Sequence, residues 1–258
     1  MWIKTNTRRP LTMTLIALSV LAWLALWLWG QSPYSRFLSH HSLDVVSEDS
    51  SLISVFILGW AVMTVAMMLP TSLPLIALFH TMTRGRRDGV WLVALLVAGY
   101  VGVWLAFGGT VYLGDWVLHQ LVEQSRWLTD RAWMISGLVL IAAGVYQFTP
   151  LKYHCLDKCR SPMTFIAERW HGQKAVREAL LLGAHHGLFC LGCCWSLMLL
   201  MFAIGAGSLG WMLVLGAVMA VEKNMPWGRR ISKPLGVALV VWGAVYFLLT
   251  AVTLRVVH

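Results

Sequence analysis

HHGLFCLGCCWSLMLLM, residues 185–201, is the segment from which the rest of the chain is best understood. It combines two adjacent histidines, three of the protein's five cysteines and two methionines with an apolar sequence that suits a membrane-spanning helix. Residues three and four positions apart share one face of a helix. The spacing therefore predicts a single stripe of nitrogen and sulfur ligands that contains His186, Cys190, Cys193 or Cys194, Leu197 or Met198, and Met201.

Imidazole, thiolate and thioether groups are the ligands that suit soft metals, Cu(I) above all, and Zn(II) accepts the first two. Each of these residues alone has an ordinary structural explanation, because methionine and cysteine also fill apolar cores. Their concentration within one membrane helix favours a metal or redox role for this segment.

The composition indicates an integral membrane protein. Of the 258 residues, 59% are hydrophobic and 12% are charged, and the mean hydropathy is +0.71, whereas about a quarter of the residues in a soluble domain are charged. The net charge of +9 does not indicate a nucleic-acid partner, because the basic residues fall in short segments between apolar runs. All cysteines lie between Cys155 and Cys194, which argues against a disulfide framework between distant loops.

Seven apolar segments predict an all-α, polytopic transmembrane bundle formed by one integral membrane domain, residues 1–258. The first segment resembles a signal-peptide core, but it is long and lacks a small-residue cleavage site, so we expect it to remain as a helix. Pro70 predicts a break in the second segment, and the third has the pattern of a plain packing helix. The expected helices cover residues 11–29, 52–80, 89–113, 132–149, 179–204, 209–222 and 234–254.

The distribution of lysine and arginine predicts a cytoplasmic amino terminus, because the basic residues alternate between the two sides of such a bundle. The fifth helix then enters from the cytoplasm, with His185 and His186 first and the cysteines near mid-membrane. Glu222, in the last turn of the sixth helix, is an ionisable residue at membrane depth and therefore a functional candidate. Its simplest partner is Lys223 or an arginine at the level of the lipid headgroups.

A second group of thiols lies in YQFTPLKYHCLDKCRSP, residues 146–162, which the sequence places after the fourth helix. Cys155 and Cys159 are four positions apart and share a face if the segment is helical. In a reducing cytoplasm, paired thiols indicate a metal or redox site rather than a structural disulfide. We therefore expect two soft-ligand clusters that lie end to end, one at the cytoplasmic mouth and one inside the membrane.

Four segments of the chain carry a family resemblance: WAVMTVAMMLP (60–70), residues 146–162, GAHHGLFCLGCCWSLM (183–198) and WMLVLGAVMAVEK (211–223). Together they resemble a bacterial family of predicted metal-binding integral membrane proteins that has no assigned function. The resemblance runs from about Trp60 to Lys223 and implies a multi-pass protein of the bacterial inner membrane. The family positions fall on Met63, Met67, Met68, Pro70, Cys155, Cys159, His186, Cys190, Cys193, Cys194, Met198, Glu222 and Lys223.

These observations favour a membrane protein that transports or delivers Cu(I) through an intramembrane Cys/Met/His site, with Zn(II) as the other candidate metal. The expected partners are the lipid bilayer, the metal ion, and a metallochaperone or a copper enzyme. No Ser–His–acid set of a hydrolase stands out, so an enzyme is not indicated. The candidate ligands are Cys190, Cys193, Cys194, His186, His185, Met63, Met67, Met68, Met198, Cys155, Cys159 and Glu222.

Two alternatives stay open. The CxxC spacing of Cys190 and Cys193 also suits a transmembrane thiol-disulfide oxidoreductase, although that chemistry gives the methionines no role. A membrane assembly factor with a structural metal is the other alternative. Its zinc ligands would be Cys155, Cys159, His154 and one of His185 and His186.

Overall fold

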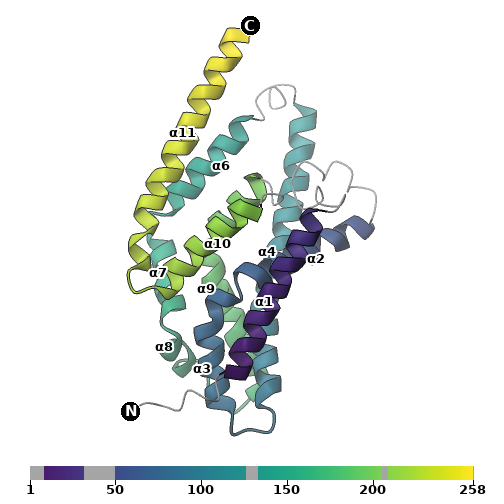
Figure 1. Ribbon diagram of the computed structural model, residues 1–258, viewed down its shortest axis with the longest axis vertical. Coiled ribbons are helices and arrows are strands. Elements are labelled where there is room, and N and C mark those ends of the chain that lie inside the picture. The colour runs from purple at the N-terminus through teal and green to yellow at the C-terminus, as the bar shows by residue number, and fades with distance from the viewer. Residues whose placement is uncertain (1–8, 32–49, 126–132, 205–208, 258) are drawn as a thin grey trace.

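The computed structural model describes residues 9–31, 50–125, 133–204 and 209–257, and every regular element in these ranges is a helix (Figure 1). Four helices are long and apolar enough to cross a bilayer, and the number rises to six if each of two bent pairs forms one span. The predicted all-α, multi-pass membrane bundle is therefore confirmed. The helices are α1 (Arg9–Gly30), α2 (Ser50–Met67), η3 (Pro70–Ser72), α3 (Leu73–Thr83), α4 (Gly89–Gln124), α6 (Trp133–Tyr146), α7 (Pro150–Arg160), α8 (Pro162–Ala167), α9 (Ala175–Ile204), α10 (Leu209–Asn224), η4 (Gly228–Arg230) and α11 (Ser232–Val257).

The chain runs up and down the long axis of the molecule, and the start of α1, the α3–α4 turn and α8 lie at the same end (Figure 1). Each of the seven predicted segments contains a helix, but several ends differ from the prediction. Helix α4 continues to Gln124 instead of ending at 113, α6 ends at Tyr146 instead of 149, and α9 begins at Ala175 instead of 179. Helix α10 starts at the predicted residue and has 16 residues, fewer than the ~20 that a perpendicular crossing needs. The cytoplasmic location of the amino terminus stays a prediction.

Pro70 breaks the second predicted helix into α2 and α3, which meet at an angle of 44°, as the sequence led us to expect. Proline has no N–H to donate, so the carbonyl of Ala66 loses its helical partner. The indole Nε1 of Trp23 donates to that carbonyl at 3.1 Å. The carbonyl of Met68, also freed at the break, accepts from the hydroxyl of Tyr100 at 3.1 Å. Side chains of other helices thus satisfy the backbone where α2 is interrupted.

The segment after the fourth predicted helix is not the loop that the sequence suggested. The chain turns by 62° after α6 and continues as α7, whose first turn is capped by the Thr149 side chain. Helix α7 packs along α9, and α8 follows it. Lys152, in the first turn of α7, is fully buried.

Small residues allow α4 and α9 to pack closely. A Cβ atom on Gly183 would lie 1.9 Å from the carbonyl oxygen of Leu96, and one on Gly99 would lie 2.2 Å from the carbonyl oxygen of Leu180. Such contacts are typical of helix pairs within membranes, where small residues let two backbones approach. Because α4 and α9 have the most extensive contact in the bundle, this packing fixes the helix that carries most of the candidate ligands.

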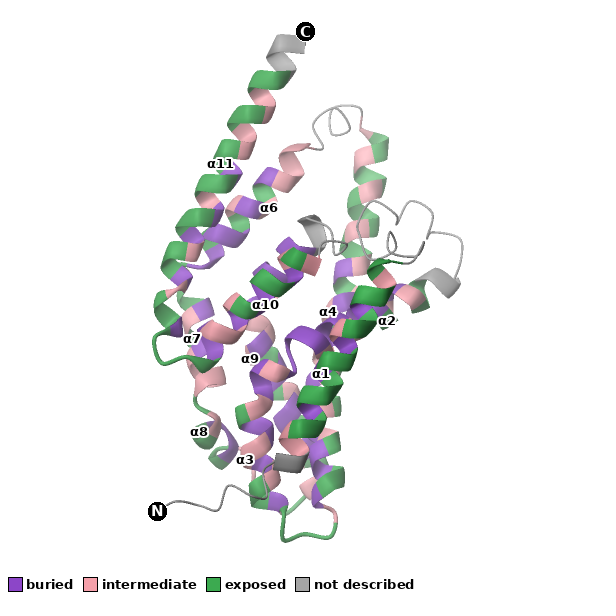
Figure 2. Ribbon diagram, in the orientation of Figure 1, coloured by how far each residue is buried: buried purple, intermediate pink, exposed green. Residues whose placement is uncertain are grey.

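Burial separates the centre of the bundle from a lipid-facing exterior. Buried residues gather around the break after α2 and along α9 and α10, whereas the outer surfaces of α1 and α11 are exposed (Figure 2). Exposed side chains on α11 include Leu248 and Leu249. Large apolar residues on the outside are expected where a helix faces lipid tails instead of water.

Candidate metal centre

All five cysteines lie on α7 and α9, in or against one buried core cluster, and all five are free thiols. Cys190, Cys193 and Cys194 of α9 are completely buried, and the sulfur atoms of Cys193 and Cys194 are 3.4 Å apart. From α7, Cys155 is buried and Cys159 is half-buried. Both pack against the core that contains the α9 cysteines, so the expectation that they share a face is confirmed.

The cysteines of α7 join those of α9 in the same core. The sulfur of Cys155 lies against Gly192, where a Cβ atom would be only 2.5 Å away, so a glycine is needed at that position. Cys159 packs against the same buried core that contains Cys193. The two clusters expected to lie end to end are therefore one cluster, because the bend before α7 folds this helix back along α9 instead of leaving it at the mouth.

Buried methionines belong to the same core. Met63 and Met67 of α2, Met68 directly after it and Met198 of α9 are buried in the core cluster that contains the cysteines. Met67 reaches α10, where its methyl group would lie 3.0 Å from a Cβ atom on Gly216. The helical break at Pro70 thus brings the thioethers predicted from α2 into the same core as the thiols of α9.

The two adjacent histidines have different environments. His186 is 3% exposed, and its Nε2 lies 3.3 Å from the hydroxyl oxygen of Ser72. Within the described ranges its other ring nitrogen, Nδ1, is buried without a hydrogen-bond partner, which leaves a lone pair or proton of the ring unused. His185 is exposed on the outer side of α9 and does not join the cluster.

Glu222 pairs with Lys152, and not with Lys223 or an arginine side chain as the sequence suggested. The Nζ of Lys152 lies 2.8 and 2.9 Å from the two carboxylate oxygens, and both side chains are at most 1% exposed. The hydroxyl of Ser232 donates to the same carboxylate at 2.6 Å, and Gln147 accepts from Lys152. The partner differs from expectation because the turn after α6 carries Lys152 into the bundle, opposite the last turn of α10.

Lys223 instead reaches the cysteine cluster. Its Nζ lies 2.7 Å from the sulfur of Cys190 and 3.2 Å from the hydroxyl oxygen of Thr71. The hydroxyl of Tyr100 lies 2.9 Å from the same sulfur. The sequence analysis missed Tyr100, although a tyrosine within an apolar helix is itself a sign of a buried hydrogen bond.

No three His, Cys, Asp or Glu side chains surround a common point in the ranges that the structure describes. The arrangement is therefore a sulfur-rich core and not a preassembled metal cage. A soft metal would be held here by two thiolates together with thioether sulfur. A third thiolate or an imidazole could join only after rotation of a side chain.

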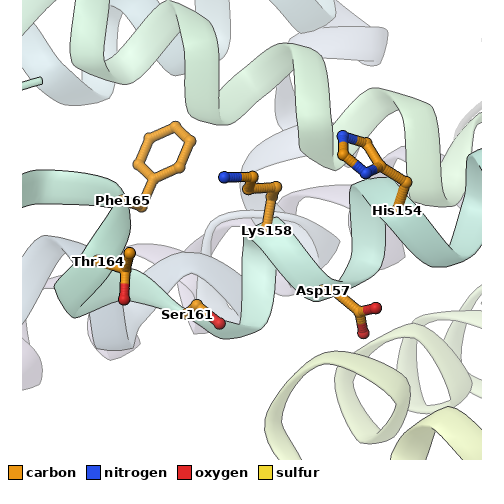
Figure 3. Close-up of a pocket in the computed structure, with 6 residues that line it drawn as sticks. All are labelled: His154, Asp157, Lys158, Ser161, Thr164 and Phe165. Carbon is orange, nitrogen blue, oxygen red and sulfur yellow. The ribbon is translucent and has the colours of Figure 1, made fainter. Parts of the chain in front are cut away.

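A cavity of about 210 Å³ at α7 and α8 is lined by His154, Asp157, Lys158, Ser161, Thr164 and Phe165. The side chains of His154, Lys158 and Phe165 point to the same side of these helices, whereas Asp157 points away from it (Figure 3). His154 is exposed and Cys155 is buried, so they lie on different faces of α7. The four zinc ligands considered above are consequently not assembled among the described residues.

Comparison with known proteins gives one family. No curated protein and no solved structure matches the chain significantly. A protein-family model described as PpoB2, copper chaperone, matches residues 57–246. This range includes α7, α9, α10, α3 and most of α2, and therefore every cysteine, Met63, Met67, Met68 and the two buried lysines. The chain belongs to the PpoB2 copper chaperone family.

Proposed function

We propose that this copper chaperone of the membrane carries Cu(I) in the sulfur-rich core between α2, α7 and α9. The observation that supports this most strongly is the convergence of all five free cysteines, from two helices, with buried methionines. Thiolate and thioether are the ligand types that favour Cu(I) over harder ions. The membrane in question is, in this proposal, the bacterial inner membrane, which the resemblance of the sequence to bacterial membrane proteins supports.

The graded burial of the thiols suggests the path of the metal. Cys159 is the half-buried cysteine of the five, so it is the thiol that a copper donor would reach first. It packs against the core that contains Cys193, whose sulfur is 3.4 Å from that of Cys194. Ligand exchange along these sulfur atoms would move Cu(I) inward in short steps, each of which can be reversed.

Only small side-chain movements are needed for such binding. Two sulfur ligands on one tetrahedral metal, with bonds of about 2.3 Å, are about 3.8 Å apart. The sulfur atoms of Cys193 and Cys194 are slightly closer than this, so a modest rotation would make room for the ion. The unpartnered Nδ1 of His186 supplies a further candidate ligand in the same core. The donor we propose is a soluble metallochaperone, and the recipient is a copper enzyme.

The test is the copper content of protein purified anaerobically, measured by mass spectrometry, with X-ray absorption to identify the ligand atoms. The first variant replaces all three α9 cysteines with serine (Cys190, Cys193 and Cys194). We expect stoichiometric, sulfur-bound copper in the wild type and none in this variant. Replacing Met67 and Met68 with leucine should weaken copper binding by about tenfold, whereas Met82→Leu, an exposed methionine on α3, should leave it unchanged.

Three results would contradict the proposal. Copper that survives the loss of the three α9 cysteines would place the site elsewhere. Equal copper affinity in the Met67/Met68 variant and the Met82 control would remove the thioethers from the site. Metal-free wild-type protein whose thiols form and break a disulfide on redox titration would instead support the oxidoreductase.

A further inference from the structure

The buried charges of the described residues do not cancel by themselves. Those residues include three buried side chains of the lysine and glutamate types: Lys152, Glu222 and Lys223. Lys152 and Glu222 form an ion pair at 2.8 Å and neutralise each other. The ammonium group of Lys223 is left without a carboxylate partner within the described ranges. A lone buried charge is strongly unfavourable, so Lys223 keeps its charge only if an anion lies beside it.

The contacts of Lys223 identify that anion. Its Nζ lies 2.7 Å from the sulfur of Cys190, and its other contact is the hydroxyl of Thr71, which carries no charge. The hydroxyl of Tyr100 also contacts the same sulfur at 2.9 Å, but it donates its one proton to the carbonyl of Met68 at 3.1 Å. The closest polar neighbour of the Cys190 sulfur is therefore the Lys223 ammonium, and this is the geometry of an ammonium–thiolate pair.

We propose that Lys223 determines the metal selectivity of the sulfur core by fixing its total charge. This inference depends on the proposed Cu(I) site. When Cu(I) binds to the Cys190 thiolate and to one further thiol, that thiol loses a proton and the metal supplies one positive charge. Two thiolates, one Cu(I) and the Lys223 ammonium then sum to zero, so the loaded site is as neutral as the empty one.

Zn(II) in the same place would leave an excess positive charge in a medium of low dielectric constant, where net charge is disfavoured. A neutral Zn(II) state would need three thiolates on one metal. No three side chains of the His, Cys, Asp and Glu types surround one point in the described part of the chain. Without Lys223, however, two thiolates and Zn(II) would be neutral, so selection for the monovalent ion would be lost.

The experiment is a competition between the two metals. Wild-type protein and variants in detergent are equilibrated anaerobically with Cu(I) and Zn(II), each held at a fixed free concentration by a chelator, and bound metals are counted by mass spectrometry. The variants are Lys223→Met, Lys223→Arg, which keeps the charge, and Lys233→Met, which makes the same chemical change at an exposed position of α11. Circular dichroism and thermal unfolding of each sample show whether it is folded.

We expect the ratio of bound Cu(I) to bound Zn(II) to fall by about tenfold or more in Lys223→Met, because one unit charge at contact distance is removed. Lys223→Arg and Lys233→Met should stay close to the wild type. If Lys223→Met does not fold, the double variant Lys223→Met/Cys190→Ser is used instead, because it removes both partners of the pair. The readout is then the amount of Zn(II) bound at the remaining cysteines, which should rise above that of the wild type.

The results separate this inference from the proposed function. Copper in every sample with an unchanged metal ratio in Lys223→Met would overturn the role of Lys223 and leave the copper site intact. If the ratio of bound Cu(I) to bound Zn(II) fell equally in Lys223→Arg, the shape of the side chain and not its charge would decide selectivity. That result would also overturn the role of Lys223 charge. A wild type without copper at its cysteines would instead reject the proposed function itself.

Discussion

The buried pair of Lys152 and Glu222 makes a quantitative prediction. Their charged atoms are 2.8 Å apart, and both side chains are excluded from the surface. At that distance two unit charges attract by about 6 kcal/mol if the effective dielectric constant is about 20. Desolvation of the two ions costs several kcal/mol each, so the pair as a whole contributes little. Removing one partner, however, leaves the other charge buried alone and should cost about 3–5 kcal/mol in the free energy of unfolding.

The assay is equilibrium unfolding in mixed micelles of increasing dodecyl sulfate content, followed by circular dichroism. Lys152→Met and Glu222→Leu should each destabilise by that amount, whereas the double variant should lie within about 2 kcal/mol of the wild type. As a control, Arg229→Met breaks an exposed pair with Asp157 and should cost less than about 1 kcal/mol. If the double variant lost the sum of the two single losses, the side chains would not be coupled, and the reasoning from buried charge would be refuted.

Two further predictions concern the helix packing and a surface turn. Gly183→Ala should destabilise the bundle by at least about 2 kcal/mol in the same assay, because its Cβ would meet a backbone carbonyl of α4 at 1.9 Å. The control is Gly102→Ala, whose Cβ would meet nothing within 4 Å and which should not destabilise the bundle. Equal losses in the two variants would contradict the role of close packing. The side chain of Arg86 donates a hydrogen bond to the carboxylate of Asp88 and holds the pKa of Asp88 below its usual value. The resulting stabilisation of the α3–α4 turn should be present above the pKa of the unfolded carboxyl and be lost as the pH falls through the lowered folded value. Hydrogen exchange of the turn, corrected for the intrinsic effect of pH, should show this loss in the wild type and not in Asp88→Asn.

The part of the site that depends on one helix could be predicted from the sequence. His186, Cys190, Cys193 and Cys194 share the buried side of α9, because helical periodicity is a local property that spacing reveals. The break at Pro70 followed from the missing N–H of a single residue. Neither result required knowledge of how the helices pack.

The contacts between helices could not be predicted in the same way. Lys152 and Glu222 are 70 positions apart, and their pairing depends on the 62° turn after α6, whose angle no local pattern encodes. Tyr100 and Cys190 are 90 positions apart, and their contact depends on the glycines that bring α4 against α9. Lys223 and Glu222 are neighbours in sequence, which suggests an ion pair between them. They do not pair, because adjacent residues of a helix point in different directions.

The interruption at Pro70 also has a mechanical consequence. An intact helical turn must give up several backbone hydrogen bonds together before it can bend. At this interruption the carbonyls of Ala66 and Met68 are held by an indole and by hydroxyl groups, each of which can leave by rotation of a single side chain. Tilting α3 against α2 therefore needs less work than bending α4 or α9, and Met67 and Met68 lie where that tilt begins.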